Sequence, residues 1–315
     1  MNFRTLALHN MLRLYKNIGQ SAYNNPKLAR AAFERLTDLL PSKLDTCTYE
    51  ELMIGDTPAE WITPKKGASS DRVLLFIHGG GYATGSIRTH RALASQIAVH
   101  AGLRALSIDY KLAPEHRFPT QINEAVAAYK FLIKQGYKPH QIAIGGESAG
   151  AGLCAGTLLY LRDHNLPLPA CAILMSPWLD LTASGSTIEG NKHKDPMVPY
   201  KGIPLWAQNY AGPDHLTDPY ASPLFGDLHG LCPIYIQVGE CEILLSDSTR
   251  FADKAKLAGV DIVDEIWPNM FHAWQGFWMV MPEGMKAIEQ LADYLREKLD
   301  AAKPRRKANT KSKAA

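Results

Sequence analysis

The chain has 315 residues, of which 46% are hydrophobic and 21% are charged, and its formal net charge is +3. These values are those of an ordinary globular protein, and the length suffices for one large core, or for one core with a smaller appendage. Six basic residues lie in the final segment, KPRRKANTKSKAA, so the rest of the chain carries a charge of −3 and gives no reason to expect a nucleic-acid partner. We expect this basic tail, residues 302–315, to be disordered.

The N-terminal segment, residues 1–45, has the pattern of amphipathic helices, with breaks at Asn25-Pro26 and at Pro41. Arginine and lysine interrupt its apolar residues, which argues against a signal peptide or a membrane span. The five cysteines are scattered, without a C-x-x-C pair or the spacing of metal ligands, as in proteins that keep reduced thiols. We therefore expect a cytoplasmic protein.

From about residue 73 onward, β-rich apolar runs alternate with helical patterns. The runs are apolar almost throughout, as in strands that are covered by helices on both faces. This alternation predicts an α/β fold with a mostly parallel sheet. We predict strands at 73–78, 102–110, 141–146, 170–177, 233–239 and 261–268, and helices at 88–100, 119–135, 150–163, 247–258 and 282–299.

One long interval, between Pro177 and Pro233, interrupts the alternation and is rich in proline, glycine and aromatic residues. It is too long for a bare connection in a compact domain, so we expect it to contain short helices. Its part from about 179 to 220 would join residues 1–45 in a helical cap over one end of the sheet. The main domain would span residues 46–301.

The segment GGESAG, residues 145–150, contains a G-x-S-x-G pattern between a predicted strand and a predicted helix. Such a tight turn holds its central residue in strained backbone geometry, and Gly146 and Gly150 leave room for the neighbouring segments. The hydroxyl of Ser148 would then stand at the carboxyl end of the sheet, at a helix N-terminus that favours negative charge. The alternative is that Ser148 only caps that helix.

A serine hydroxyl needs a base within hydrogen-bond reach to act as a nucleophile. His272 follows the last predicted strand, and the segment GECEILLSDS supplies acids directly after the preceding strand. The order serine, acid, histidine is that of an α/β-hydrolase. Glu240, Glu242 and Asp247 are the candidates for the acid. We favour Glu242, since it lies on the loop from which a carboxylate can reach His272, whereas Asp247 begins a helix and can serve as a cap.

Three consecutive glycines, Gly79, Gly80 and Gly81, follow the strand VLLFIH, although each glycine costs backbone entropy when it is ordered. Attack by a serine on an ester carbonyl would place a negative charge on the carbonyl oxygen. Bare amides can point their N–H groups at that oxygen, each contributing roughly 3–4 kcal/mol, and the amide of Ala149 would add another donor. A phosphate-binding loop is the alternative, but the segment lacks the G-K-[ST] sequence of such loops.

Six ordered motifs resemble those of the hormone-sensitive-lipase-like group of α/β-hydrolase esterases and lipases, over about residues 60–300. They are HGGG (78–81), YKLAPEHRFP (110–119), GESAG (146–150), DPYASPLFGDL (218–228), GECEILLSDS (239–248) and FH (271–272). The resemblance implies a single catalytic domain with a helical cap. It also implies Ser148 as nucleophile, His272 as general base, oxyanion N–H groups on Gly80, Gly81 and Ala149, and supporting roles for His78, Gly146, Glu147 and Gly150.

One residue departs from the pattern of many relatives, which carry aspartate where this chain has Glu242. A subgroup with E-x-L-L, which the EILL of this chain resembles, has glutamate there. Glutamate is one methylene longer but can orient a histidine in the same way. The sequence therefore favours Glu242 and keeps Asp247 as the alternative acid.

We therefore expect a carboxylic ester hydrolase for small esters of short to medium acyl chain, which forms an acyl-enzyme and needs no metal or other cofactor. Its partner would be the small-molecule ester, with no nucleic acid and no membrane span, and a homodimer through an edge strand is common in similar folds. Two alternatives stay open. One is hydrolysis of an amide or an acetylated small molecule by the same mechanism, and the other is binding of a small molecule without turnover.

Overall fold

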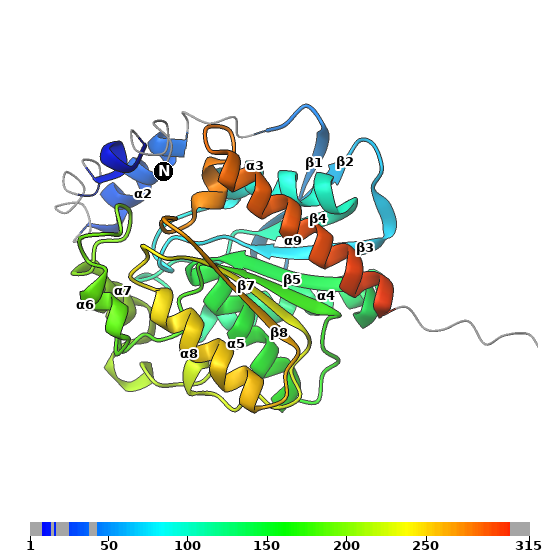
Figure 1. Cartoon of the computed structure of the whole chain (residues 1–315). Helices are drawn as coiled ribbons and strands as arrows, with labels where there is room; N and C mark the ends of the chain where they lie inside the picture. The colour runs from blue at the N-terminus through cyan, green and yellow to red at the C-terminus, as the bar shows by residue number, and fades with distance from the viewer. Residues whose placement is uncertain (1–7, 14–15, 17–24, 38–42, 303–315) are drawn as a thin grey trace, which may run out of the picture.

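An eight-stranded sheet forms the centre of the computed structural model, which describes residues 8–13, 16, 25–37 and 43–302 (Figure 1). The strands lie in the order β1-β2-β4-β3-β5-β6-β7-β8, and all neighbours from β4 to β8 are parallel. Their bounds are β1 (Cys47–Ile54), β2 (Thr57–Pro64), β3 (Ser69–Ile77), β4 (Leu103–Ile108), β5 (Ile142–Glu147), β6 (Cys171–Met175), β7 (Ile234–Gly239) and β8 (Ile262–Trp267).

Helices cover both faces of this sheet, which confirms the predicted α/β fold (Figure 1). Helices α3 (Ile87–Ala101) and α9 (Pro282–Ala301) pack on one face, and α4 (Thr120–Lys134), α5 (Ala149–Asp163) and α8 (Leu245–Leu257) pack on the other. Alternate residues of one strand therefore enter two different cores. In β5, for example, Ile142 and Ile144 join the α5 side and Ala143 joins the α9 side, which is why the strand is apolar throughout.

The first two strands were not predicted from the sequence. Strands β1 and β2 form an antiparallel hairpin around Gly55 and Asp56, and β2 pairs antiparallel with β4. Strand β1 is the edge of the sheet, and four of its eight residues are exposed, including the adjacent Glu50 and Glu51. This hairpin lacks the continuous apolar run that marked the other strands, so a search for such runs passes over it.

The opposite edge of the sheet is β8, and it is less buried than its sequence suggests. Val263 and Ile266 are 43% and 47% exposed, and β8 has a neighbouring strand on one side only in the sheet of the described residues. The expectation of burial on both faces therefore fails at this edge. A homodimer formed through an edge strand stays a prediction.

The interval between β6 and β7 contains the short helices α6 (Ser186–Gly190) and α7 (Gly202–Ala211), as expected from its length. Near the N-terminus, residues 8–13 are helical and α2 (Pro26–Thr37) begins at the predicted break. Arg30 of α2 donates hydrogen bonds to the carbonyl oxygens of Ala83 and Ala113, which attaches this helix to the loops after β3 and β4. The break at Pro41 and all of the predicted tail except Ala302 lie outside the described residues.

Candidate active site

The turn between β5 and α5 has strained backbone geometry at Ser148, with φ 54° and ψ −119°. Both flanking glycines are required by close packing. A Cβ on Gly146 would lie 2.6 Å from the carbonyl carbon of Gly150, and a Cβ on Gly150 would lie 2.2 Å from the oxygen of Ile77. The Ser148 side chain makes no capping hydrogen bond to α5, so the alternative role as a helix cap finds no support.

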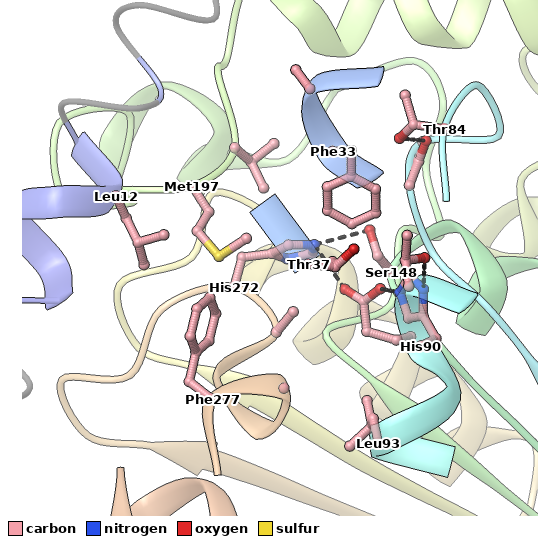
Figure 2. Close-up of a pocket in the computed structure, with 18 of the residues that line it drawn as sticks. Leu12, Phe33, Thr37, Thr84, His90, Leu93, Ser148, Met197, His272 and Phe277 are labelled. Atoms are coloured by element: carbon pink, nitrogen blue, oxygen red, sulfur yellow. Dashed lines mark hydrogen bonds and ion pairs between the residues drawn. The ribbon is translucent and has the colours of Figure 1, made fainter. Parts of the chain in front are cut away.

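Ser148, His272 and Glu242 lie in one chain of hydrogen bonds at the carboxyl ends of the parallel strands. The Oγ of Ser148 is 2.9 Å from Nε2 of His272, and Nδ1 of His272 is 2.9 Å from Oε2 of Glu242. Figure 2 shows Ser148 and His272 pointing toward one another in a pocket. All three side chains are buried, and Glu242 has no exposed surface. Segments far apart in the sequence thus meet with the spacing that proton transfer requires.

The carboxylate of Glu242 is held from three directions. Besides its contact with His272, its Oε1 accepts hydrogen bonds from the Ser176 hydroxyl at 2.8 Å and from the Gly239 amide at 2.5 Å. The Ser176 hydroxyl also accepts from the amide of Ala273, so it links the acid to the segment that bears the histidine. Ser176 was not singled out in the sequence, although it directly follows β6 at the same edge of the sheet.

The other two acid candidates lie elsewhere. Asp247 is fully buried, and its Oδ2 accepts hydrogen bonds from the amides of Leu179 and Asp180, both at 3.0 Å. Burial raises the pKa of Asp247 to about 8. Glu240 accepts a hydrogen bond from the amide of Asn269. Among the three candidates, only Glu242 contacts the imidazole through a hydrogen bond that the described residues show.

The three consecutive glycines meet three different demands. A Cβ on Gly79 would lie 1.8 Å from Oε2 of Glu147, so this glycine leaves space for a carboxylate. Gly80 has φ 110° and accepts hydrogen bonds from Thr84, and Gly81 has φ 62°, both in the left-handed region that favours glycine. The Gly79 amide donates to Nε2 of His90. When Nε2 accepts this bond, the Gly79 amide is not free to donate to a substrate oxygen, in contrast to the expectation that all three glycines would do so.

The remaining donors are the amides of Gly80, Gly81 and Ala149. Within the described part of the chain, the hydrogen bonds include no protein acceptor for these three amides. Ala149 is the first residue of α5, where backbone N–H groups have no partner within the helix. These amides can therefore donate to a bound ligand beside Ser148.

His78 lies beneath the glycine loop as a buried support. Its ring stacks on Tyr110 at 4.2 Å between centroids, and the Tyr110 hydroxyl donates to the His78 carbonyl oxygen. The His78 Nδ1 lies 2.8 Å from the oxygen of Gly79. Burial lowers the pKa of His78 to about 3, so the ring is neutral at physiological pH and adds no charge to the loop.

A second carboxylate, that of Glu147, also reaches the site. Its Oε1 is 3.3 Å from Nε2 of His272, and its Oε2 is 3.2 Å from Nε2 of His90. From the sequence, Glu147 is expected only in a supporting role, and His90 lies in the predicted helix 88–100 without a role of its own. The available signal was the position of Glu147, a charged residue directly before the nucleophile in a segment of glycine, alanine and serine.

Ser148 and His272 open into a cavity of about 440 Å³, a volume suited to a small organic ligand. Its walls come from the N-terminal segment, the glycine loop, α3, the interval after β6 and the turn after His272. They are largely apolar, although Arg88 and Thr89 of α3 are also part of them. They include Leu8, Met11, Leu12, Phe33, Met197, Trp206, Phe277 and Trp278. Leu12, Met197 and Phe277 can be followed in Figure 2. The cavity therefore favours an apolar ligand with one polar group at Ser148.

Three further observations concern the described residues alone. They contain no group of three or more histidine, cysteine, aspartate or glutamate side chains placed to hold a metal ion. No helix among them is long and apolar enough to cross a membrane. All five cysteines are free thiols.

Comparisons with known proteins agree with this architecture. The chain is 38% identical to an acetyl-hydrolase of Streptomyces hygroscopicus over 267 residues, which are 85% of this chain and 88% of the relative. It is 35% identical to an esterase of Acinetobacter venetianus over 270 residues, again 85% of this chain and 88% of the relative.

Solved structures of esterases are similar along nearly the whole chain. A structure of EstE5 soaked with p-nitrophenyl butyrate has a TM-score of 0.90 and 37% identity, and the match covers 95% of this chain and 100% of EstE5. An esterase from the bacterial hormone-sensitive lipase family has a TM-score of 0.88 and 39% identity, with 95% and 99% covered. Residues 74–276 match a family described as having the alpha/beta hydrolase fold. The chain is thus a hydrolase that belongs to the α/β-hydrolase family, in the group of esterases related to bacterial hormone-sensitive lipase.

Proposed function

We propose that this protein hydrolyses small carboxylic esters of short to medium acyl chain, with Ser148 as nucleophile, His272 as general base and Glu242 as the acid that orients the base. The observation that carries this proposal is the unbroken path from the Ser148 Oγ to the Glu242 carboxylate, with two contacts of 2.9 Å. The path ends in a largely apolar cavity that can hold an ester.

The reaction begins when Nε2 of His272 takes the proton of Ser148 while Oγ attacks the ester carbonyl. The negatively charged oxygen of the tetrahedral intermediate accepts hydrogen bonds from the amides of Gly80, Gly81 and Ala149. The imidazolium then gives its proton to the leaving alkoxide, and the acyl group stays on Ser148.

Deacylation repeats these steps with water. His272 removes a proton from the water as the water attacks the acyl-enzyme, and the carboxylic acid leaves when Ser148 regains its proton. Throughout the cycle Glu242 accepts a hydrogen bond from Nδ1–H, which holds the ring in the tautomer that leaves Nε2 free. Ser176 and Gly239 keep that carboxylate in place.

The substrate class rests on the cavity and on the relatives. A volume of about 440 Å³ accommodates a short to medium acyl chain together with a small alcohol. Similarity to an acetyl-hydrolase keeps the cleavage of acetylated small molecules as a second candidate, since the same residues can attack an acetyl ester or an amide. Ligand binding without turnover is the weaker alternative, because Ser148 and His272 already have the spacing for proton transfer.

We further infer that residues 1–45 and about 179–220 act as a cap, because Leu12, Phe33, Met197 and Trp206 from these segments line the cavity. The catalytic domain would span residues 46–301. A reducing compartment such as the cytoplasm would keep the five cysteines as thiols.

The test is hydrolysis of p-nitrophenyl acetate and butyrate by the purified protein and by Ser148→Ala. The wild type should release p-nitrophenol, and the variant should lose about 10⁴-fold or more in kcat, because it lacks the nucleophile. Thermal unfolding shows whether the variant keeps its fold. Undiminished turnover by a folded Ser148→Ala protein would refute the role of Ser148.

A further inference from the structure

His272 is contacted by a carboxylate at each of its two ring nitrogens. Glu242 lies 2.9 Å from Nδ1, and Glu147 lies 3.3 Å from Nε2, the same nitrogen that faces Ser148. The mechanism above uses only the first of these carboxylates. Glu147 is the last residue of β5 and is about 5% exposed, so its charge is screened little by solvent.

The surroundings of Glu147 hold its carboxylate in this position. Its second oxygen lies 3.2 Å from Nε2 of His90, and a protonated Nε2 donates to it. This is the alternative to the tautomer in which the same Nε2 accepts the Gly79 amide. The other ring nitrogen of His90 is 2.8 Å from the hydroxyl of Thr89 on α3. The absence of a side chain at Gly79 leaves the space that this oxygen occupies, since a Cβ there would come within 1.8 Å. The position of the Glu147 carboxylate, and not a substrate, therefore requires a glycine at the first position of GGG, Gly79.

We propose that Glu147 is a positioning residue for the base: its carboxylate stabilises the protonated imidazole of His272 from the Nε2 side and so determines the pH range in which the enzyme works. The inference rests on the proposed function. When Ser148 has given up its proton, the new Nε2–H group lies between the Ser148 Oγ and the Glu147 carboxylate, and it can interact with both. Before the transfer, the same carboxylate faces the lone pair of a neutral ring and is unfavourable.

The charges around the imidazole agree with this role. Burial alone lowers the pKa of His272, but hydrogen bonds to Glu147 and Glu242 outweigh burial and raise the pKa well above 6.5. Burial alone raises the pKa of Glu147, but its contacts with His272 and His90 lower it to about 2. Glu147 is thus ionised at every pH at which the enzyme would work, and it does not itself accept the proton.

The other titratable and charged groups near this pair come from four segments. One is Tyr110, which follows β4 and interacts electrostatically with Glu147. His90 faces Glu147 from α3, and His78 acts on it from the glycine loop. Asp195, from the interval after β6, acts on Glu242. None of these groups replaces the charge of Glu147 at the Nε2 edge, where the structure places only that carboxylate and Ser148 among the described residues.

The raised pKa of His272 determines the direction of the pH effect. The neutral imidazole is the active base, so activity should rise as the pH rises through the raised pKa of His272. Glu147→Gln removes the negative charge and keeps the size of the side chain. The acidic limb of kcat/KM should therefore move to lower pH by about one to three units, the range found for an opposite charge at such distances. The rate at alkaline pH should fall, because the imidazolium intermediate loses a stabilising charge.

The experiment compares kcat/KM for p-nitrophenyl butyrate between about pH 5 and pH 10 in the wild type and three variants. Glu147→Gln removes the charge, and Glu147→Asp keeps it. Glu240→Gln removes an exposed charge that bonds to the amide of Asn269, as a control for a change in net charge. The acidic limb should move in Glu147→Gln and stay within about half a unit of the wild type in the other two.

A second measurement does not depend on turnover. The titration of the His272 ring, followed by NMR of ¹⁵N-labelled histidine, should move in Glu147→Gln by the same amount as the acidic limb. An unmoved titration in a folded Glu147→Gln protein would overturn the proposal, and so would an equal shift in Glu147→Asp. Failure of the proposed function is a separate outcome, since it would show as undiminished turnover by Ser148→Ala while the ring could still be titrated.

Discussion

Replacing Glu242 by glutamine tests which carboxylate orients the base. The change removes a negative charge 2.9 Å from Nδ1 of His272 and keeps the size of the side chain. With an effective dielectric constant of about 20, the attraction between unit charges at this distance is about 6 kcal/mol. At about 1.4 kcal/mol for each tenfold change in rate, its loss corresponds to a decrease in kcat of about 10⁴-fold. The corresponding change in the triad of serine proteases, from aspartate to asparagine, costs about 10⁴-fold in kcat.

Asp247→Asn is the matched control for this prediction. It also converts a fully buried carboxyl group to an amide, but the Asp247 carboxyl accepts hydrogen bonds from Leu179 and Asp180 instead of from His272. Its kcat should stay within about threefold of the wild type, less than 1 kcal/mol. The assay is steady-state hydrolysis of p-nitrophenyl butyrate, with circular dichroism to show that both variants fold. A loss of about a thousandfold in Asp247→Asn, with Glu242→Gln keeping more than about a tenth of the activity, would refute the reasoning.

Two further predictions concern stability and substrate length. Burial raises the pKa of Asp247 from 3.8 to about 8, so between these values the unfolded chain has an ionised Asp247 and the folded chain a protonated one, and the free energy of unfolding falls as the pH rises. In Asp247→Asn the free energy of unfolding should no longer show this fall. Between pH 5 and pH 8 it should exceed that of the wild type by a few kcal/mol in urea unfolding, about the size of the linkage. A difference between the two proteins that does not change with pH would contradict this prediction. Trp206 lines the cavity and its indole lies beside Gly81, so Trp206→Ala should make room for a longer acyl chain. The ratio of kcat/KM for p-nitrophenyl octanoate to kcat/KM for p-nitrophenyl butyrate should rise by about tenfold. An unchanged ratio would place the acyl chain elsewhere.

Asp247 and Glu242 are both buried acids, but their surroundings differ. Glu242 is paired with an imidazole and receives two further hydrogen bonds, while Oδ1 of Asp247 has no hydrogen-bond partner among the described residues. A buried carboxyl group without a charged partner is more stable when protonated. Asp247 is therefore suited to hold the backbone of Leu179 and Asp180, and Glu242 to hold a base that becomes charged.

The sequence by itself determined the α/β fold, the positions of six of the eight strands, and the sharp turn at Ser148. These features depend on local patterns, such as apolar runs between helical segments and glycines two residues on either side of a serine. The hairpin of β1 and β2 escaped the same approach, because β1 is half exposed and neither strand carries a continuous apolar run. The order of serine, acid and histidine was also readable, since chain order is part of the sequence.

Only the tertiary structure decided which side chains meet. Glu242 and Asp247 are five residues apart and equally acidic, and only the path of the loop after β7 turns the first toward His272. The place of Glu147, between two histidines from α3 and the turn after β8, depends on segments that are distant in the sequence. Local patterns carry the shape of a turn or a strand, but the direction of a side chain toward a distant partner is set by how the whole chain packs.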